Sequence, residues 1–230
     1  MQKLSIGSKG QTRNSLKKNR RKQAANPKAH AAKASKSAAR KLANTTKTKV
    51  ELVSSKLAYR GPLFDVFTDY VREPEGIVSR RDVIRHSGSV VILAVDTAQN
   101  SRDPLIVVER QYRHAAGQYM WEVPAGRREP GEGILFGAKR ELLEETGYCA
   151  KRWTKLAYFY VSPGFLGEWM QVYLAEELSL GQSKPDDDEY IEHRQIPLSQ
   201  AIQWIEAGKI IDAKSIIAIL LYQRRLQSRR

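Results

Sequence analysis

The glutamates between residues 141 and 145 are the side chains whose spacing points most directly to chemistry. Glu141 and Glu145 are four residues apart and Glu144 is three residues from Glu141, so on a helix their carboxylates share one face. Like charges at this spacing repel by about 0.2–0.5 kcal/mol per pair unless a cation neutralises them. Oxygen ligands without His or Cys nearby favour a hard ion such as Mg²⁺ or Mn²⁺, which enzymes acting on phosphates commonly use. The alternative is a solvated helix face, on which Lys139 and Arg140 offset the acidic charge.

A longer pattern favours the first interpretation. From Gly126 to Gly147 the chain follows Gly-x5-Glu-x7-Arg-Glu-Leu-x-Glu-Glu-x-Gly. This string resembles the signature of the Nudix hydrolases. Its eight specified positions would arise by chance in a chain of this composition with a probability on the order of 10⁻⁷ to 10⁻⁶. Tyr148 stands where the signature ends in an aliphatic residue, and its large, mostly apolar side chain can fill the same place in the core.

The resemblance implies roles for the residues of the motif. Nudix hydrolases cleave a nucleoside diphosphate linked to another moiety, using divalent metal ions to polarise the phosphates and ready a water for attack. By position, Glu141 and Glu145 resemble the metal ligands. Glu144 resembles a metal ligand or a catalytic carboxylate that supports one, and Arg140 resembles the arginine that orients a glutamate. The remaining motif residues are expected to close the loop onto the helix and to let the chain turn: Glu132, Gly126 and Gly147.

The flanking segments resemble one branch of this family, the ADP-ribose pyrophosphatases. Within residues 51–226 the likeness is carried by Val108–His114, Trp121–Gly126, Tyr160–Phe165, Asp188–Glu192 and Gly208–Lys214. Pro163, fifteen positions after Tyr148, matches a proline that marks substrate specificity in this branch. The resemblance also implies that the carbonyl of Ala125 binds metal and that Glu168 is a further metal ligand or the catalytic base. The alternative is that Glu168 is an ordinary loop residue.

Arginine side chains supply the expected contacts to the substrate phosphates. Arg113 is the leading candidate, because a guanidinium can grip two phosphate oxygens at once. A plain salt bridge between Arg113 and Glu122 is the competing interpretation. The expected substrate-binding set is Arg113, Glu122, Arg60 and Arg85.

The elements that must position these residues follow from hydrophobic periodicity and turn signals. Short β-branched and aromatic runs, separated by Gly and Pro, predict an antiparallel meander before residue 87. Apolar residues at helical spacing between Gly133 and Gly147 predict the helix that carries the glutamates. The other predicted elements are strands at Glu51–Tyr59, Leu63–Val71, Val78–Ile84, Val90–Asp96, Leu105–Gln111, Met120–Val123, Lys155–Val161 and Gln171–Glu176, and helices at Leu198–Ala207 and Ala213–Leu226.

Strands interleaved with helices predict an α/β layered core. The resemblance makes this expectation more specific: the Nudix fold, in which a mixed β-sheet is sandwiched between helices, with a small N-terminal antiparallel β region. It also implies that this β region forms a homodimer. We therefore expect three regions: a basic tail at residues 1–49, an N-terminal β-strand dimerisation region at residues 50–86, and a Nudix hydrolase domain at residues 87–230.

The positive charge is confined to the tail. The formal net charge is +14, yet the first 50 residues hold 15 of the 39 Lys and Arg residues and no Asp or Glu. The remainder carries 24 basic and 25 acidic residues, so its charge does not indicate nucleic-acid binding. The tail also lacks aromatic residues and cannot offset a backbone ordering entropy of roughly 1–2 kcal/mol per residue. We predict that it is disordered.

The tail itself leaves several interpretations open. Lys17–Lys22 could contact nucleic acid non-specifically. The composition also resembles an organelle transit peptide or a nuclear localisation patch. A third possibility is a true start further along, near Val50. For the rest of the chain, a lone Cys149 excludes a disulfide framework, and the apolar run Ser89–Val95 is too short to span a bilayer, so we expect a soluble, cytoplasmic protein without membrane contact.

The leading functional hypothesis is Mg²⁺-dependent hydrolysis of the pyrophosphate bond of ADP-ribose to AMP and ribose 5-phosphate, with Mn²⁺ as the alternative ion. Other small-molecule substrates of the same class, ADP-glucose, GDP-mannose or a dinucleotide, stay open because loops outside the motif select the sugar. A hypothesis of another class is a nucleic-acid-associated protein that acts through its tail. A Nudix domain without activity is the remaining alternative, and the complete set of motif carboxylates argues against it.

Overall fold

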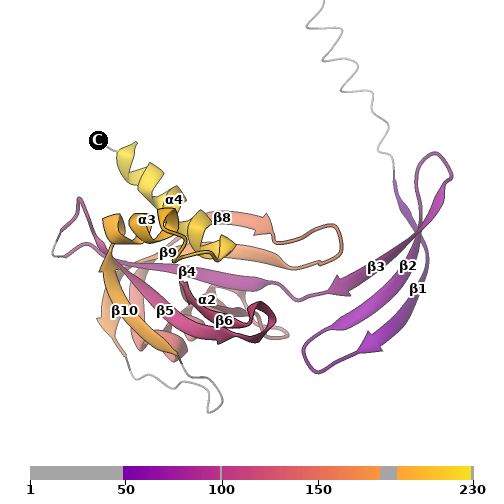
Figure 1. Ribbon diagram of the computed structural model, residues 1–230. Helices are drawn as coiled ribbons and strands as arrows, with labels where there is room; N and C mark the ends of the chain where they lie inside the picture. The colour runs from indigo at the N-terminus through magenta and orange to yellow at the C-terminus, as the bar shows by residue number, and fades with distance from the viewer. Residues whose placement is uncertain (1–48, 99, 182–190, 229–230) are drawn as a thin grey trace, which may run out of the picture. The chain divides into compact units, whose positions relative to one another are not determined.

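Two β-sheets form the framework of the chain in the computed structural model, which describes residues 49–98, 100–181 and 191–228 (Figure 1). The tail predicted to be disordered lies outside the described residues, apart from Lys49. The acidic segment at 184–189 and most of Asp188–Glu192 also lie outside them. The described residues form two sheets and the helices packed against them.

The first sheet is an antiparallel meander of strands β1 (Glu51–Arg60), β2 (Asp65–Arg72) and β3 (Val78–Arg85). β2 lies in the middle and pairs with both neighbours over its full length. The turn between β2 and β3 is closed by the amide of Gly76, which donates to the carbonyl of Glu73 over 2.8 Å. Gly76 has a positive φ of 86°, a conformation that glycine adopts without steric cost. The predicted N-terminal antiparallel β region is confirmed.

The second sheet is mixed and has seven strands within the described residues. Its main order is β10-β5-β4-β9-β8, with β6 added to β5 and β7 added to β4. The pairing of β4 with β9 is parallel and the other pairings are antiparallel. The strands are β4 (Ser89–Asp96), β5 (Leu105–Arg113), β6 (Gln118–Glu122), β7 (Ala125–Arg127), β8 (Tyr148–Tyr160), β9 (Trp169–Leu180) and β10 (Glu192–Pro197), and a short 3₁₀ helix, η1 (His114–Ala116), follows β5.

Helices cover both faces of this sheet (Figure 1). Helix α2 (Ile134–Thr146) packs on one face, while α3 (Leu198–Glu206) and α4 (Ala213–Gln227) pack on the other. Strand β4 is buried on both faces, which explains why its sequence is an unbroken apolar run and does not alternate. The predicted sheet sandwiched between helices is therefore confirmed. The α2 side of the core contains Val90, Ile92, Ala94, Ala138 and Leu142; the α4 side contains Val91, Leu93, Val95, Ala218 and Ile219.

Local sequence explains where the helices begin and end. Gly147 ends α2 in a left-handed conformation with φ of 70°, and its amide donates to the carbonyl of Leu143 over 2.9 Å. Asp212 precedes α4 and accepts a hydrogen bond from the amide of Ser215 over 2.9 Å. No helix in the part of the chain that the structure describes is long and apolar enough to cross a membrane.

Three strand assignments from the sequence were wrong. Strands β7 and β10 were not predicted, and β8 begins at Tyr148, seven residues before the predicted start at Lys155. β7 has only three residues and includes Gly126, so it shows no periodicity. β10 lies at the sheet edge and consists largely of polar residues. Only the pairing of these segments with neighbouring strands makes them β structure.

Candidate active site

A pocket of about 710 Å³ lies where α2, β5, β7 and the segments before β9 and α4 meet. Its walls carry several acidic side chains and several cations, with apolar residues at the rim. The polar or charged residues that line it are Arg140, Glu141 and Glu145 of α2, Gln111 and Arg113 of β5, and Ser89, Arg127, Glu129, Glu168, Asp212, Lys214 and His86. Residues from eight different parts of the chain thus face one cavity, as expected for a ligand site.

On α2, Arg140 collects the glutamates that would otherwise repel one another. Its guanidinium lies 2.9 Å from Glu132, 2.8 Å from Glu141 and 2.7 Å from Glu144. The hydrogen bond to Glu132, with further contributions from Glu141 and Glu144, raises the pKa of Arg140. The same bond lowers the pKa of Glu132, which closes the loop before the helix. Arg140 therefore fixes both the loop and the carboxylates in one arrangement.

Strand β7 packs against two glutamates of α2, Glu141 and Glu145. A Cβ atom added to Gly126 would lie 2.0 Å from the carboxyl carbon of Glu141, so only glycine leaves room for that side chain. The amide of Ala125 donates to Glu145 Oε2 over 3.1 Å. Glu141 and Glu145 are thus seated against two consecutive residues of one strand.

Next to them lies a buried chain of ion pairs. Arg113 donates to both carboxylate oxygens of Glu122, over 3.0 and 2.7 Å. Lys214 also donates to Glu122 and lies 3.1 Å from Asp212. Burial alone would raise the pKa of Glu122, but the bonds from Arg113 and Lys214 lower it below its ordinary value. Arg113 and Lys214 line the pocket while Glu122 holds them from behind.

Glu109 is a buried carboxyl group without such partners. It is 0% exposed, and neither of its carboxyl oxygens has a hydrogen-bond partner among the described residues. Burial raises its pKa to about 8, opposed in part by the charge of Lys214. Glu109 faces Glu122 across the β5–β6 pairing and also interacts with Glu145. The carboxyl group of Glu109 is therefore largely protonated at neutral pH, next to the pocket residue Glu145.

Glu168 reaches the pocket from the loop between β8 and β9. Ser89 Oγ donates to Glu168 Oε1 over 2.6 Å, and His86 Nδ1 lies 3.9 Å from the same oxygen. The side chain of Glu168 is 18% exposed. Because Glu168 lines the same pocket as Glu141 and Glu145, one ligand in that pocket can contact all three side chains.

The structure brings most of the predicted site residues into this one pocket. Glu141, Glu145, Glu168, Ala125, Gly126, Arg140 and Arg113 all line it. Glu144 contacts Arg140 without lining the pocket, and Glu122 acts through Arg113, so the predicted salt bridge between Arg113 and Glu122 is present. Glu132 and Gly147 flank the helix, as the motif implies. Pro163 lines a neighbouring pocket of about 340 Å³.

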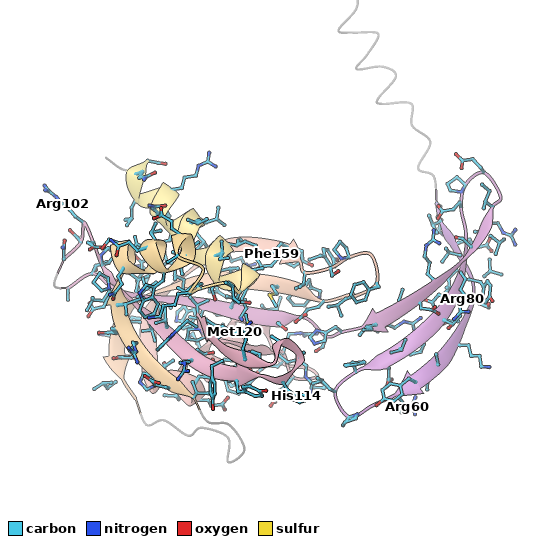
Figure 2. The ribbon with its side chains drawn as sticks, viewed as in Figure 1. Arg60, Arg80, Arg102, His114, Met120 and Phe159 are labelled. Atoms are coloured by element: carbon cyan, nitrogen blue, oxygen red, sulfur yellow. The ribbon has the colours of Figure 1, made fainter. Side chains whose placement is uncertain are left out.

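Two of the predicted substrate-binding arginines lie elsewhere. Arg60 is at the end of β1 (Figure 2), where its largely exposed side chain lies 3.8 Å from Asp65. Arg85 pairs with Asp69 over 3.1 Å and stacks on Phe67 at 3.7 Å from the ring centroid. Neither side chain lines the pocket that holds the motif glutamates.

Several residues of the site were not singled out from the sequence. Gln111 and Glu109 share the strand face of Arg113 because β5 alternates, so this period of two was the available signal. Asp212 and Lys214 lie in Gly208–Lys214, a segment that contributed to the family resemblance without marking either residue as part of the site. Ser89 begins an apolar strand and gave no signal.

The donor atoms of the pocket fit a hard divalent cation. The acidic residues offer oxygen ligands only, and the space over Gly126 is filled by the carboxyl group of Glu141. As the side chains stand among the described residues, Arg140 bridges the glutamates and no cluster of three acidic, His or Cys side chains converges on one point. Glu141, Glu145 and Glu168 are the residues that would hold the ion.

Comparison with known proteins agrees with this site. The NUDIX domain family matches residues 85–218, and the chain belongs to this family. An ADP-ribose pyrophosphatase of Bacillus subtilis (strain 168) is 37% identical over 173 residues, which cover 74% of this chain and 91% of that protein. A methanol dehydrogenase activator of Bacillus methanolicus is 34% identical with the same coverage.

A solved structure supports the fold. The crystal structure of an ADP compounds hydrolase superposes with a TM-score of 0.69 at 20% sequence identity, covering 81% of this chain and 98% of that one. At this level of identity the likeness concerns the fold alone. The signature from Gly126 to Gly147 falls within the matched residues.

Proposed function

We propose that this protein hydrolyses the pyrophosphate bond of ADP-ribose, giving AMP and ribose 5-phosphate. The observation that carries the proposal is the meeting of Glu141, Glu145 and Glu168 with Arg113 in one pocket. Carboxylates that can hold a divalent ion, opposite a guanidinium, suit a negatively charged diphosphate. The similarity to an ADP-ribose pyrophosphatase over most of both chains favours this substrate.

Each residue has a part that follows from its contacts. Arg113 and Lys214 offer positive charge to phosphate oxygens and are held in place by Glu122. Arg140 bridges Glu141 and Glu144 and so orients their carboxylates. Glu168, in the pocket wall, is the candidate to take a proton from the attacking water. When bound, a divalent cation would neutralise charge on the diphosphate and lower the pKa of a bound water.

We propose Mg²⁺ as the ion, with Mn²⁺ as a substitute. The carboxylate oxygens of Glu141, Glu145 and Glu168 support a hard ion, because Mg²⁺ is usually bound through one or two carboxylates together with substrate phosphates. Isothermal titration with Mg²⁺ and Mn²⁺ tests this assignment without measuring activity. Glu145→Gln should weaken binding at least tenfold, whereas Glu206→Gln, an exposed glutamate at the end of α3, should leave it unchanged. Equal affinity in the two variants would contradict the ligand assignment.

The substrate is tested with a panel of ADP-ribose, ADP-glucose, GDP-mannose and a dinucleotide, each with and without Mg²⁺. We expect the highest kcat/KM on ADP-ribose, and products that separate as AMP and ribose 5-phosphate. Glu145→Gln and Glu168→Gln should each lower kcat by orders of magnitude, with Glu206→Gln as the control. Turnover of another compound in preference to ADP-ribose would move the assignment to that nucleoside diphosphate sugar.

We also propose that residues 50–86 form a homodimer interface. The described part of this segment exposes large apolar side chains, among them Leu52 at 55%, Tyr70 at 43% and Ile77 at 62%. Such exposure on one small sheet is typical of a surface that another chain covers. Light scattering after gel filtration should give twice the chain mass of 26.1 kDa, and a monomer would contradict the proposal. We further propose a cytoplasmic location, which the free Cys149 supports because disulfides are rare in that compartment.

A further inference from the structure

The loop that carries Glu168 is hydrogen-bonded to the end of strand β3. The amide of Ile84 donates to the carbonyl of Phe165 over 2.7 Å, and the amide of Gly167 donates to the carbonyl of Ile84 over 2.9 Å. These bonds form a short parallel bridge between residues 84 and 166. The backbone immediately before Glu168 is therefore held by a neighbouring segment.

The backbone immediately after Glu168 is held as well. A Cβ atom on Gly88 would lie 2.1 Å from the ring of Trp169, so the indole packs directly on the glycine backbone. Gly88 has a positive φ of 89°, and a side chain there would be strained in any case. The amide of Val161 closes the loop by donating to the carbonyl of Glu168 over 3.1 Å. With the main chain fixed on both sides, the freedom that remains lies in the side chain of Glu168.

Ser89 removes that freedom. Its Oγ donates to Glu168 Oε1 over 2.6 Å, and among the described residues it is the single hydrogen-bond donor to this carboxylate. His86 Nδ1 is 3.9 Å away and already accepts the amide hydrogen of Gly88 over 3.0 Å, so this nitrogen does not donate to Glu168. Oε2 of Glu168 receives no hydrogen bond from the described residues and stays available to water or an ion.

Ser89 is itself rigid. It is 6% exposed and is the first residue of β4, where its Cα partners are Arg127 of β7 and Met170 of β9. A glutamate side chain has several rotamers, and holding it in one of them costs conformational entropy. A hydroxyl fixed between two strands can select one rotamer by a hydrogen bond to the carboxylate. Ser89 thus connects strand β4 to the side chain of Glu168 through one hydrogen bond.

We propose that Ser89 is a positioning residue, which fixes the carboxylate of Glu168 in the wall of the pocket through one hydrogen bond to Oε1. The inference rests on the proposed function, because it concerns the residue through which the reaction is proposed to proceed. Ser89 also lines the pocket, but its hydroxyl donates to Glu168, and in this assignment it acts through that carboxylate.

Kinetics on whichever panel compound the enzyme turns over test the coupling. Ser89→Ala should lower kcat by about 10- to 100-fold, as expected for a lost hydrogen bond to a charged group, with KM changed much less. Ser89→Thr, which keeps the hydroxyl, should restore most of kcat. Ser87→Ala is the matched control, because the Ser87 hydroxyl donates instead to the carbonyl of Arg128 over 3.0 Å. In a Glu168→Gln background, Ser89→Ala should have little further effect.

An independent measurement separates this inference from the proposed function. In ¹³C NMR of protein labelled at the glutamate carboxyl carbons, the side-chain signal of Glu168 should shift or broaden in Ser89→Ala relative to the parent protein, and stay unchanged in Ser87→Ala. This readout does not require activity, so an inactive parent protein would refute the proposed function alone. An unchanged Glu168 side-chain signal in Ser89→Ala, or the same loss of kcat with and without Glu168, would overturn the role of Ser89.

Discussion

The carboxyl group of Glu109 should make the folded protein lose stability as the pH rises. Its pKa is about 8 in the folded chain against an ordinary value of 4.5. Between these values the folded state keeps a proton that the unfolded chain has already released. Stability is therefore fully present below pH 4.5 and is lost as the pH rises through 8. Each pH unit in this window corresponds to about 1.4 kcal/mol, so the complete loss is on the order of 5 kcal/mol.

Urea denaturation at intervals from pH 5 to 9, in the presence of EDTA, measures this contribution. Gln has the shape of Glu109 without the ionisation, so the informative quantity is the unfolding free energy of the parent protein minus that of Glu109→Gln. We expect this difference to fall by roughly 3–4 kcal/mol between pH 5 and pH 9. Common effects of pH on the other groups cancel in the subtraction.

Glu122 provides the control, because it is equally buried and its pKa is shifted in the opposite direction. A lowered pKa contributes stability above pH 4.5 and loses it only as the pH falls through the folded value. The corresponding difference for Glu122→Gln should thus stay level from pH 5 to 9. A level difference for Glu109→Gln as well would refute the assignment of an unpaired, protonated carboxyl at that position.

Three further substitutions test the site and its support. Gly126→Ala should displace Glu141 from its seat and weaken Mn²⁺ binding at least tenfold in a calorimetric titration, whereas Gly133→Ala, where an added Cβ meets nothing within 4 Å, should not. Leu142→Ala removes a side chain that is 0% exposed and should cost about 2–5 kcal/mol in urea denaturation; a loss below 1 kcal/mol would contradict the packing of α2. Arg140→Met leaves Glu132 and its neighbours without their cation and should cost about 3 kcal/mol at pH 7. Because the lowered pKa of Glu132 contributes stability only above its folded value, that cost should shrink in thermal denaturation near pH 3, and a larger cost at low pH would count against the pairing.

The part of the site that the sequence predicted is the part encoded locally. Glu141, Glu145 and Arg140 lie within six consecutive residues of one helix, so their spacing alone places them on a common face. The glycines at either end of the motif also mark where the helix must stop and where the loop must turn. The fold class was predictable for a related reason, because the doubly buried run of β4 and the periodicity of α2 are each visible in a single segment.

The rest depends on contacts between distant segments. Lys214 and Glu122 are 92 residues apart, and nothing near either residue indicates the other. Ser89 and Glu168 are 79 residues apart and meet because β4 and β9 pair in parallel. Strand β7 consists of residues whose pairing with β4 cannot be inferred from composition. Arg60 and Arg85 illustrate the converse, since a side chain of the right type for binding phosphate need not face the pocket.

Glu109 and Glu122 show why residue type and strand position are insufficient even where the strand is predicted correctly. They face each other in the β5–β6 ladder and are both buried, yet the pKa of one is raised and that of the other is lowered. The difference arises from donors: Arg113 and Lys214 both bond to Glu122, and neither bonds to Glu109. Because Lys214 comes from the start of α4, the packing of that helix decides which of two facing carboxyl groups is ionised. The ionisation of these two carboxyl groups therefore depends on the packing of α4, on the far side of the sheet from α2.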